Sequence, residues 1–407
     1  MLKWVLGGLA TVGVVAGVGY ASLDKDQRAL IAAMPTDRNV LFWSVDQRDA
    51  AFRAMDALPI LAETRTIAAG NKPYPLPAGL PLQIDMDVAA YMKAQRTSAL
   101  VIVLDGKVVL EEYGLGFAPE GKWTSFSVAK SLTSTLVGAA IRDGAIESID
   151  DPVTKYIAGL KGSAYDNVSV EQLLTMTSGV KWNEDYTDPN SDVARFNEHK
   201  AEEGLDVTVS YMRKLPREAP AGEKWVYKTG ETNLIGVLVS EATGKTLSEY
   251  LSEKIWKPFG MQQDATWLLG STGHEIAGCC IQAATRDMAR FGLFVMGGGM
   301  AGGEQVVPDD WFGAATVRQA DIGAPGKGYG YQWWTYDSGA FAAQGIFGQG
   351  IFIDPARKLV IASNSNWPTA TGDAVGSQRE EFYRAVQAAV DKRGPPIMTS
   401  PAASAGS

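Results

Sequence analysis

Apolar residues recur at helical spacing along the segment that follows Ser127. Val128, Leu132 and Leu136 are four positions apart, which places their side chains on one face of a helix. An Asp-Gly pair directly after Arg142 stops the pattern, because glycine commonly follows the last residue of a helix. The sequence therefore predicts a helix from about Ser127 to Arg142 with a buried face.

β-rich runs lie on both sides of a long helical block. Two runs within residues 98–114 flank Asp105-Gly106, a pair typical of tight hairpin turns. Three more strands are predicted near the C-terminus, at Ala340–Phe347, Gly350–Asp354 and Lys358–Ser363. Neither group buries a face alone, so both are expected to join in one sheet, while the intervening helices form a second lobe. The predicted fold class is therefore α+β, and the cleft between the lobes is the expected place for a site.

The remaining periodic segments predict further helices. They lie around Gln27–Met34, Gln47–Met55, Met86–Gln95, Ala194–Lys214, a segment ending near Glu241, Leu247–Ile255, Thr285–Met296 and Ser377–Lys392. The proline-rich residues 72–81 resist regular structure. We therefore expect an irregular N-terminal extension at residues 22–80, one two-lobed domain at residues 81–393 and a disordered tail at residues 394–407.

The N-terminus has the pattern of an export signal. Lys3 precedes an apolar run from Trp4 to Ala21, and Gly19 and Ala21 supply the small residues of a cleavage site. If the segment is not cleaved, residues 4–21 would instead anchor the chain in the inner membrane, because the run is near the minimum length that spans a bilayer. We expect the protein to be periplasmic or secreted.

Composition narrows the range of functions. The chain has 407 residues and a net charge of -9 without a basic run, so a nucleic-acid partner is not expected. Its two histidines and two cysteines exclude a Cys/His zinc cluster and leave few candidates for a histidine-based triad. Cys279 and Cys280 are adjacent and cannot join distant loops, so we expect packed thiols rather than a redox pair. No metal or cofactor is predicted.

The predicted helix at Ser127 begins with two groups that could act together. Ser-x-x-Lys occurs at residues 22–25, 127–130 and 178–181, but only the middle copy opens a long apolar helix. Ser127 and Lys130 are one turn apart and share a helix face. A serine hydroxyl needs a base to become a nucleophile, and a lysine can be that base only where desolvation keeps it neutral. The pair is thus a candidate for nucleophilic catalysis.

Several motifs in order give the chain a family resemblance. These are Trp-Thr-Ser-Phe-Ser-Val-Ala-Lys-Ser at 123–131, Leu-Thr-Met-Thr-Ser-Gly-Val at 174–180, Trp-Asn-Glu-Asp-Tyr at 182–186, the Tyr227 segment and the C-terminal β pair. Together they resemble the serine β-lactamase and penicillin-binding superfamily over residues 81–392. The branch that is most similar contains class C β-lactamases, related esterases and the aminohexanoate-dimer (nylon-oligomer) hydrolases. The resemblance implies an antiparallel sheet flanked by helices, beside a mainly helical lobe.

The resemblance also implies roles for the three central residues. Ser127 would be the acylated nucleophile, Lys130 its base partner, and Tyr227 the group that carries the proton to the leaving group. Such a tyrosine is expected to have its pKa lowered by nearby cations such as Lys130. Thr229 matches the third position of the tyrosine motif and is expected to contact substrate.

A second set of residues is expected to border the substrate. Lys228-Thr229-Gly230 spells the Lys-Thr-Gly element of β-lactamases but overlaps the tyrosine motif, so we interpret it as a coincidence. The positional equivalent is Gln344-Gly345-Ile346, where Gly345 admits the substrate and the backbone N–H groups of Ile346 and Ser127 would form an oxyanion hole. This strand lacks the cation of the lactam-recognising relatives. Tyr186 and Asp185 on one loop, and Gln282, are further candidates for the cleft wall.

These observations predict an exported serine hydrolase that cleaves small-molecule amides or esters through an acyl-enzyme on Ser127. One alternative is a β-lactamase or D-Ala-D-Ala carboxypeptidase. An alternative from another class is a penicillin-binding-like module that binds ligands without catalysis, against which the joint presence of Ser127, Lys130 and Tyr227 argues.

Overall fold

The computed structural model describes residues 24–57 and 63–393. The predicted export signal at residues 1–21 and the predicted tail at residues 394–407 lie outside this part of the chain. Within it, none of the helices combines the length and the apolar character needed to cross a membrane.

A seven-stranded antiparallel sheet forms the centre of the larger lobe, in the order β3-β2-β13-β12-β11-β10-β9. Its strands are β2 (Thr97–Leu104), β3 (Lys107–Tyr113), β9 (Lys327–Tyr329), β10 (Trp334–Tyr336), β11 (Phe341–Gly345), β12 (Gln349–Asp354) and β13 (Leu359–Ser365). Val101 of the early hairpin pairs with Ala362 of the late strands. The prediction that the two groups of strands join in one sheet is therefore confirmed.

Both faces of this sheet are covered by helices. Val101 and Val103 of β2 pack into the core shared with α5 (Val128–Arg142) and α12 (Thr285–Met296), whereas Leu100 and Ile102 pack with α4 (Val88–Ala94) and α14 (Asp373–Arg393). Because successive strand residues point to opposite faces, two covered faces require an unbroken apolar run. This explains why residues 99–103 are all apolar rather than alternating with polar ones.

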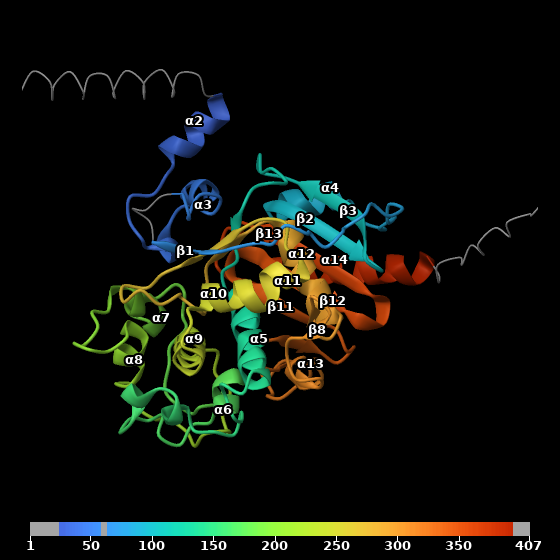
Figure 1. Ribbon diagram of the computed structural model, residues 1–407. Coiled ribbons are helices and arrows are strands. Elements are labelled where there is room, and N and C mark those ends of the chain that lie inside the picture. The colour runs from blue at the N-terminus through green and yellow to red at the C-terminus, as the bar shows by residue number, and fades with distance from the viewer. Residues whose placement is uncertain (1–23, 58–62, 394–407) are drawn as a thin grey trace, which may run out of the picture.

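The second lobe is mainly helical and lies on the other side of α5 (Figure 1). It contains α6 (Val170–Leu174), α7 (Asp192–Arg195), α8 (Val207–Met212) and α9 (Thr229–Thr243), of which α9 packs directly on α5. The predicted buried face of α5 is confirmed, and the burial extends around the helix over residues 128–140. A helix between two lobes has no solvent side, and its hydroxyls are satisfied by backbone carbonyls, as when Ser134 Oγ donates to the Tyr331 carbonyl at 2.6 Å.

A smaller four-stranded sheet was not predicted. It has the order β1-β5-β6-β4, formed by β1 (Thr64–Ile67), β5 (Ala265–Leu268), β6 (Ile281–Ala283) and β4 (Trp123–Thr124). Since β1 belongs to residues 22–80, the expectation that this extension is irregular apart from short helices is wrong. The extension is paired through β1 to the strand that precedes the segment around residue 278.

The remaining elements are short. They are α2 (Lys25–Ala32), α3 (Val45–Ala51), α10 (Leu247–Leu251), α11 (Lys257–Phe259), α13 (Trp311–Ala315), β7 (Met300–Ala301), β8 (Glu304–Gln305), a π turn at Ser252–Trp256 and 3-10 turns at Val40–Phe42, Val153–Lys155, Ala158–Leu160, Phe196–Glu198, Ile346–Gly348 and Pro355–Arg357. The continuous helix predicted over Ala194–Lys214 is wrong. Gly204 has a φ of 80°, and Asp206 caps a new helix by accepting from the Thr208 N–H at 2.8 Å.

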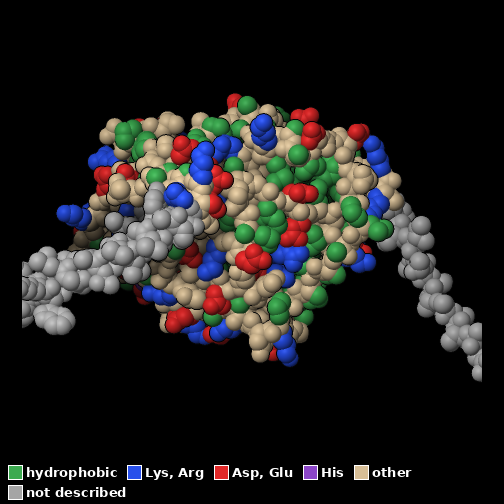
Figure 2. Space-filling model, turned by 90° about the horizontal axis from the view of Figure 1, so that it is seen from above, with side chains coloured by type: hydrophobic (Ala, Val, Ile, Leu, Met, Phe, Trp, Pro, Cys, Tyr) green, Lys and Arg blue, Asp and Glu red, His purple; other side chains and the backbone are tan. Residues whose placement is uncertain are grey.

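Charged side chains of both signs are interspersed over the face shown in Figure 2. On that face, Lys and Arg do not gather into an extended basic area of the kind that binds nucleic acid.

Candidate active site

Ser127 lies at a sharp turn between β4 and α5. The turn is fixed to β6, because the Ser125 N–H donates to the Ile281 carbonyl at 2.8 Å and Ser125 Oγ accepts from the Ile281 N–H at 3.0 Å. Phe126 has a φ of 42°, a left-handed conformation that non-glycine residues rarely adopt away from functional sites. This turn leaves the Ser127 side chain 8% exposed, which is enough to reach a ligand but little enough to limit solvent.

Lys130 lies one helical turn further along and is fully enclosed. Its Nζ donates to Thr229 Oγ1 at 3.0 Å and to the Gly278 carbonyl at 2.9 Å, and it lies 5.3 Å from the centre of the Tyr227 ring. Burial lowers the pKa of Lys130 to about 7, against the opposing effect of the Glu184 carboxylate. A large part of the lysine is therefore neutral at neutral pH and able to accept a proton.

Tyr227 lies two residues before the start of α9, and its hydroxyl is a neighbour of the Ser127 side chain. Its ring stacks on Trp334 with centres 5.6 Å apart. Burial and the nearby Glu184 charge raise the pKa of Tyr227, so the expectation that cations lower it is wrong. The physical reason is that the nearby cation is itself half neutral, whereas the enclosing aromatic side chains penalise a phenolate. Tyr227 thus remains a neutral phenol, and Lys130 is the group of the three that changes charge near pH 7.

Glu184 supports this cluster and was missed by the sequence analysis. Its carboxylate accepts from the Thr229 N–H at 2.9 Å, from Thr229 Oγ1, from Trp182 Nε1 and from Tyr186 OH at 2.8 Å. A hydrogen-bonded path therefore runs from Lys130 Nζ through the Thr229 hydroxyl to Glu184. The neighbouring Asp185 is exposed and bonds the Thr187 N–H at 2.8 Å instead.

Replacing Glu184 by glutamine is expected to move the pH dependence of the predicted hydrolysis. The Glu184 charge stabilises protonated Lys130, so its removal should lower the pKa of Lys130 below the present value of about 7. The acidic limb of kcat/KM, which reports groups of the free enzyme, should then shift to lower pH. Hydrolysis of a nitrophenyl ester measured from pH 5 to 9 checks this, with Asp185→Asn as the matched control that keeps the wild-type limb. A limb that moves equally in both variants, or in neither, contradicts the assignment.

Gly345 brings the end of β11 against the serine turn. A Cβ at this position would lie 3.0 Å from the Ser127 nitrogen and 2.7 Å from the Ser125 carbonyl oxygen, so only glycine permits the approach. Ile346 follows directly and lines the same pocket as Ser127. This arrangement is compatible with the predicted oxyanion hole. The Gln344 side chain belongs to the other face of the sheet, where it accepts from Arg379 at 2.7 Å.

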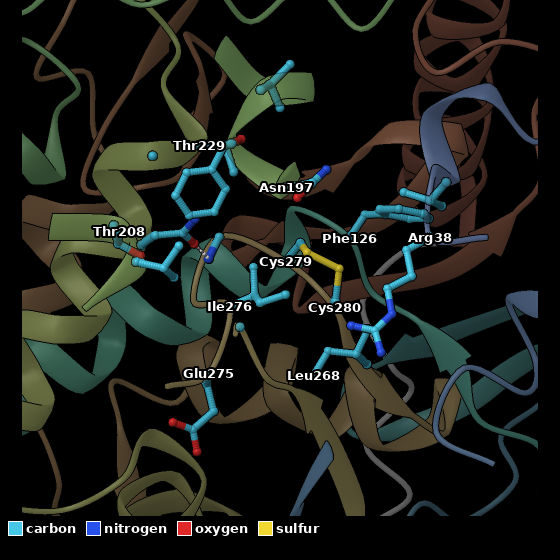
Figure 3. A pocket seen from close by; sticks show the side chains of 18 of the residues that line it. Arg38, Phe126, Asn197, Thr208, Thr229, Leu268, Glu275, Ile276, Cys279 and Cys280 are labelled. Atoms are coloured by element: carbon cyan, nitrogen blue, oxygen red, sulfur yellow. Dashed lines mark hydrogen bonds between the residues drawn. A yellow bond between two sulfur atoms is a disulfide. The ribbon is translucent and has the colours of Figure 1, made fainter. Parts of the chain in front are cut away.

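A pocket of about 220 Å³ opens at Ser127 (Figure 3). Tyr186 and Thr229 line it, as the sequence predicts, together with Asn233 of α9. The extension adds a wall that sequence reasoning missed, with Arg38, Val40, Leu41, Trp43 and Met55.

Two residues singled out by the sequence lie elsewhere. Gln282 is buried in the inner strand β6, opposite Thr124 and Thr266, and is not among the residues that line this pocket. Lys228 is also fully buried, with its Nζ 3.8 Å from a Glu231 carboxylate oxygen. It lies outside the residues that line the pocket, in agreement with the interpretation of Lys228-Thr229-Gly230 as a coincidence.

The two cysteines depart from expectation. Cys279 and Cys280 form a disulfide with each other, so the prediction of packed thiols is wrong. Adjacent cysteines can close such a bond where the backbone turns sharply, and Cys280 has a φ of 77°. Both residues line the pocket, facing Phe126 and Leu268 in Figure 3. In the part of the chain that the structure describes, His, Cys, Asp and Glu do not gather into a group that could hold a metal ion.

A serine at the start of a buried helix, a lysine one turn on and a tyrosine beside the serine are the features of serine hydrolases that act by acyl transfer. Residues 84–383 match the family model described as Beta-lactamase, and the chain belongs to this family. It is a serine hydrolase of the β-lactamase and penicillin-binding type.

Named relatives agree with this family. The chain is 32% identical over 299 residues to a 6-aminohexanoate-dimer hydrolase of Paenarthrobacter ureafaciens, covering 69% of this chain and 76% of the relative. A Bacillus anthracis protein provisionally named a 6-aminohexanoate-dimer hydrolase has a similar structure, with a TM-score of 0.75, 23% identity and coverage of 86% of this chain and 95% of that one. A class C β-lactamase aligns with a TM-score of 0.56, 14% identity and coverage of 74% and 93%. The two structural matches bear on the fold alone.

Proposed function

We propose that the protein is an exported hydrolase that cleaves small linear amides or esters through an acyl-enzyme on Ser127. The observation that carries this proposal is the enclosure of Lys130 one helical turn from Ser127, with its Nζ 3.0 Å from Thr229 Oγ1 and 5.3 Å from the centre of the Tyr227 ring. This burial lowers the pKa of Lys130 to about 7. Neutral Lys130 takes up the Ser127 proton as the serine oxygen attacks the carbonyl carbon. The backbone N–H groups of Ser127 and Ile346 stabilise the resulting oxyanion.

The same groups complete the reaction. When the tetrahedral intermediate collapses, the proton held by Lys130 passes through the Tyr227 hydroxyl to the leaving amine or alcohol. Water then attacks the acyl-enzyme, loses a proton to the same groups and releases the acid, which restores Ser127. The neutral state of Tyr227 fits this role, because a phenol can give one proton while it receives another.

The pocket supports a linear substrate with an apolar chain. Trp43, Ile276 and Ile346 provide apolar walls, and Ser127 and Thr229 provide hydroxyl groups. The relative from Paenarthrobacter ureafaciens is named for the hydrolysis of a 6-aminohexanoate dimer. We propose that linear amides of this kind, and short esters, are within the substrate range of this protein.

Short-chain esters are expected to be hydrolysed with a higher kcat/KM than linear amides, and penicillins or cephalosporins with the lowest. A β-lactam carboxylate without a charged partner forfeits hydrogen bonds of ~1.5–3 kcal/mol, or about one to two orders of magnitude in rate. An amide is slower than an ester because its amine must be protonated to leave. Side-by-side kcat/KM values on nitrophenyl acetate, an aminohexanoate dimer and a chromogenic cephalosporin check the order.

A higher kcat/KM for the cephalosporin than for the ester would overturn this order. It would favour the alternative of a β-lactamase or D-Ala-D-Ala carboxypeptidase. Lys228 is too deeply buried to be the cation in that case. Arg38, which lines the pocket from the extension, would be the residue to replace, with Arg38→Lys as the charge-conserving control.

A fluorophosphonate probe tests the proposed chemistry directly. It should label the native protein at Ser127, as shown by peptide mass spectrometry, because it traps activated serines. Ser131→Ala is the matched control, since Ser131 lies on the same helix but donates to the Gln332 carbonyl at 2.7 Å. No labelling of the native protein would support the inert binding module. Loss of labelling in Ser131→Ala would instead contradict Ser127 as the labelled residue.

We propose further that the protein is exported. This proposal rests on Lys3, the apolar run that follows it and the small residues of Gly19-x-Ala21. Protein recovered from the cell envelope should begin after Ala21, or else remain intact in the inner membrane. Intact protein in the soluble cytoplasmic fraction of the native host contradicts this.

A further inference from the structure

The segment from Ile276 to Ile281 lies between the catalytic helix and the small sheet. Its successive carbonyls are all engaged: Ala277 accepts from Thr133 Oγ1 at 2.9 Å, Gly278 from Lys130 Nζ at 2.9 Å and Cys279 from Trp267 Nε1 at 2.9 Å. The Gly278 carbonyl is thus one of two acceptors that fix the amine of Lys130. The path of this backbone segment therefore decides where that amine is held.

There is little free space around Gly278. Its N–H donates to Asn233 Oδ1 at 2.7 Å, and a Cβ on this residue would lie 2.9 Å from Lys130 Nζ and 2.8 Å from Thr229 Cγ2. A small rotation of the peptide unit that carries the Gly278 carbonyl would therefore either break the bond to Lys130 or push against it. Positioning to within a fraction of an ångström matters for proton transfer, because it is short-ranged.

The Cys279–Cys280 disulfide begins at the next residue. It closes a small ring that includes the peptide bond between the two cysteines, and so restricts the backbone directly after the Gly278 carbonyl. Cys280 holds a left-handed φ of 77°, which a non-glycine residue keeps only when its surroundings demand it. Both cysteines line the pocket at Ser127, and Cys280 also packs into the apolar cluster around Phe126 and Leu268 (Figure 3).

We infer that the Cys279–Cys280 disulfide is a positioning element of the active site, which holds the Gly278 carbonyl against Lys130 and makes turnover sensitive to dithiol reductants. The inference rests on the proposed function, in which Lys130 is the base. Reduction breaks the sulfur–sulfur bond, and each sulfur gains one electron and one proton from the dithiol, which becomes a cyclic disulfide. The freed peptide can then rotate, and the lysine loses a fixed acceptor.

The test compares wild-type protein before and after treatment with dithiothreitol. Because Cys279 and Cys280 are the only cysteines, a thiol titration in denaturant reports this bond alone. We expect no thiols before reduction and both after it. With nitrophenyl acetate, reduction should lower kcat by about 10-fold, in line with the cost of misplacing a catalytic group, while KM changes much less. Removal of the reductant and reoxidation should restore kcat.

A double variant, Cys279→Ser with Cys280→Ser, provides the matched comparison. It should have the kcat of the reduced wild type and should not respond to dithiothreitol. Thiols found in untreated protein, an unchanged kcat after proven reduction, or a change in KM alone would each overturn the inference. If the double variant does not fold, the reduction of folded wild type still decides the question. Failure of the proposed function has a different signature, since oxidised wild type would then neither hydrolyse the ester nor react with the fluorophosphonate.

Discussion

The Ser127→Ala variant is expected to lose ~10³-fold or more in kcat on every substrate that the wild type turns over, while it keeps its fold. The first effect follows from the removal of the hydroxyl that we propose as the nucleophile. The second follows from the place of Ser127 in the structure. Its side chain does not cap α5, and the turn that carries it is held by Ser125 and Phe126 rather than by its own hydroxyl.

Three measurements make this prediction sharp. Thermal unfolding should give nearly equal midpoints for wild type and Ser127→Ala, because a partly exposed hydroxyl without a capping role contributes little to stability. Ser131→Ala, the same change one turn along α5, should keep most of the activity but lose stability, since it leaves the Gln332 carbonyl without its 2.7 Å donor. A purified Ser127→Ala sample that retains most of its kcat would remove Ser127 as the nucleophile.

The parts of the site that the sequence could predict are those encoded locally. Ser127 and Lys130 are three positions apart on one helix, so a periodicity argument alone brings them together. Tyr227 came from the resemblance rather than from periodicity, because α9 begins only at Thr229 and the tyrosine lies in an irregular segment. Its neighbours in space, Tyr329 and Trp334, are about a hundred positions away and give no local signal.

Glu184 shows why the remaining groups could not be predicted. Within Trp182-Asn-Glu-Asp-Tyr186, the two adjacent acids are equivalent in sequence, and only the fold shows that one bonds Thr229 while the other faces solvent. The predicted direction of the Tyr227 pKa shift was wrong for a related reason. The sequence indicates which charges are nearby, but not how completely the aromatic side chains around Trp334 exclude water.

The fold likewise contains elements that the sequence could predict and elements that it could not. The hairpin at residues 98–114 shows two β-rich runs around a turn, and helix α12 shows a helical period. Both elements lie where the sequence predicts them. The small sheet has strands of two to four residues, too short to show any period, and is assembled from segments as distant as β1 and β6. The sequence therefore also contains no sign that the extension contributes to the pocket. Strand β1 pairs the extension with the domain, and residues of the extension form one wall of the pocket.

The Lys130→Arg variant is expected to be nearly as impaired as Lys130→Ala, with kcat/KM reduced by ~10²–10⁴-fold, the range for loss of a general base. Arginine keeps a positive charge but does not deprotonate at any pH at which the enzyme is folded. Lysine can serve here only because burial lowers its pKa to about 7. The guanidinium is also larger than the ammonium, and the space between Thr229 and the Gly278 carbonyl is filled in the wild type.

The pH dependence separates a base from a fixed charge. Below pH 7 the Lys130 ammonium becomes the major form and the rate should fall, whereas above pH 7 the free amine predominates and the rate should level off. Wild type should therefore show an acidic limb of kcat/KM near pH 7, and both variants should lack it, because neither retains a group that titrates there. Stopped-flow or plate-reader assays with nitrophenyl acetate from pH 5 to 9 provide all three profiles. If Lys130→Arg keeps a near-normal rate while Lys130→Ala does not, the positive charge is what the reaction needs, and Tyr227 or water must take up the serine proton.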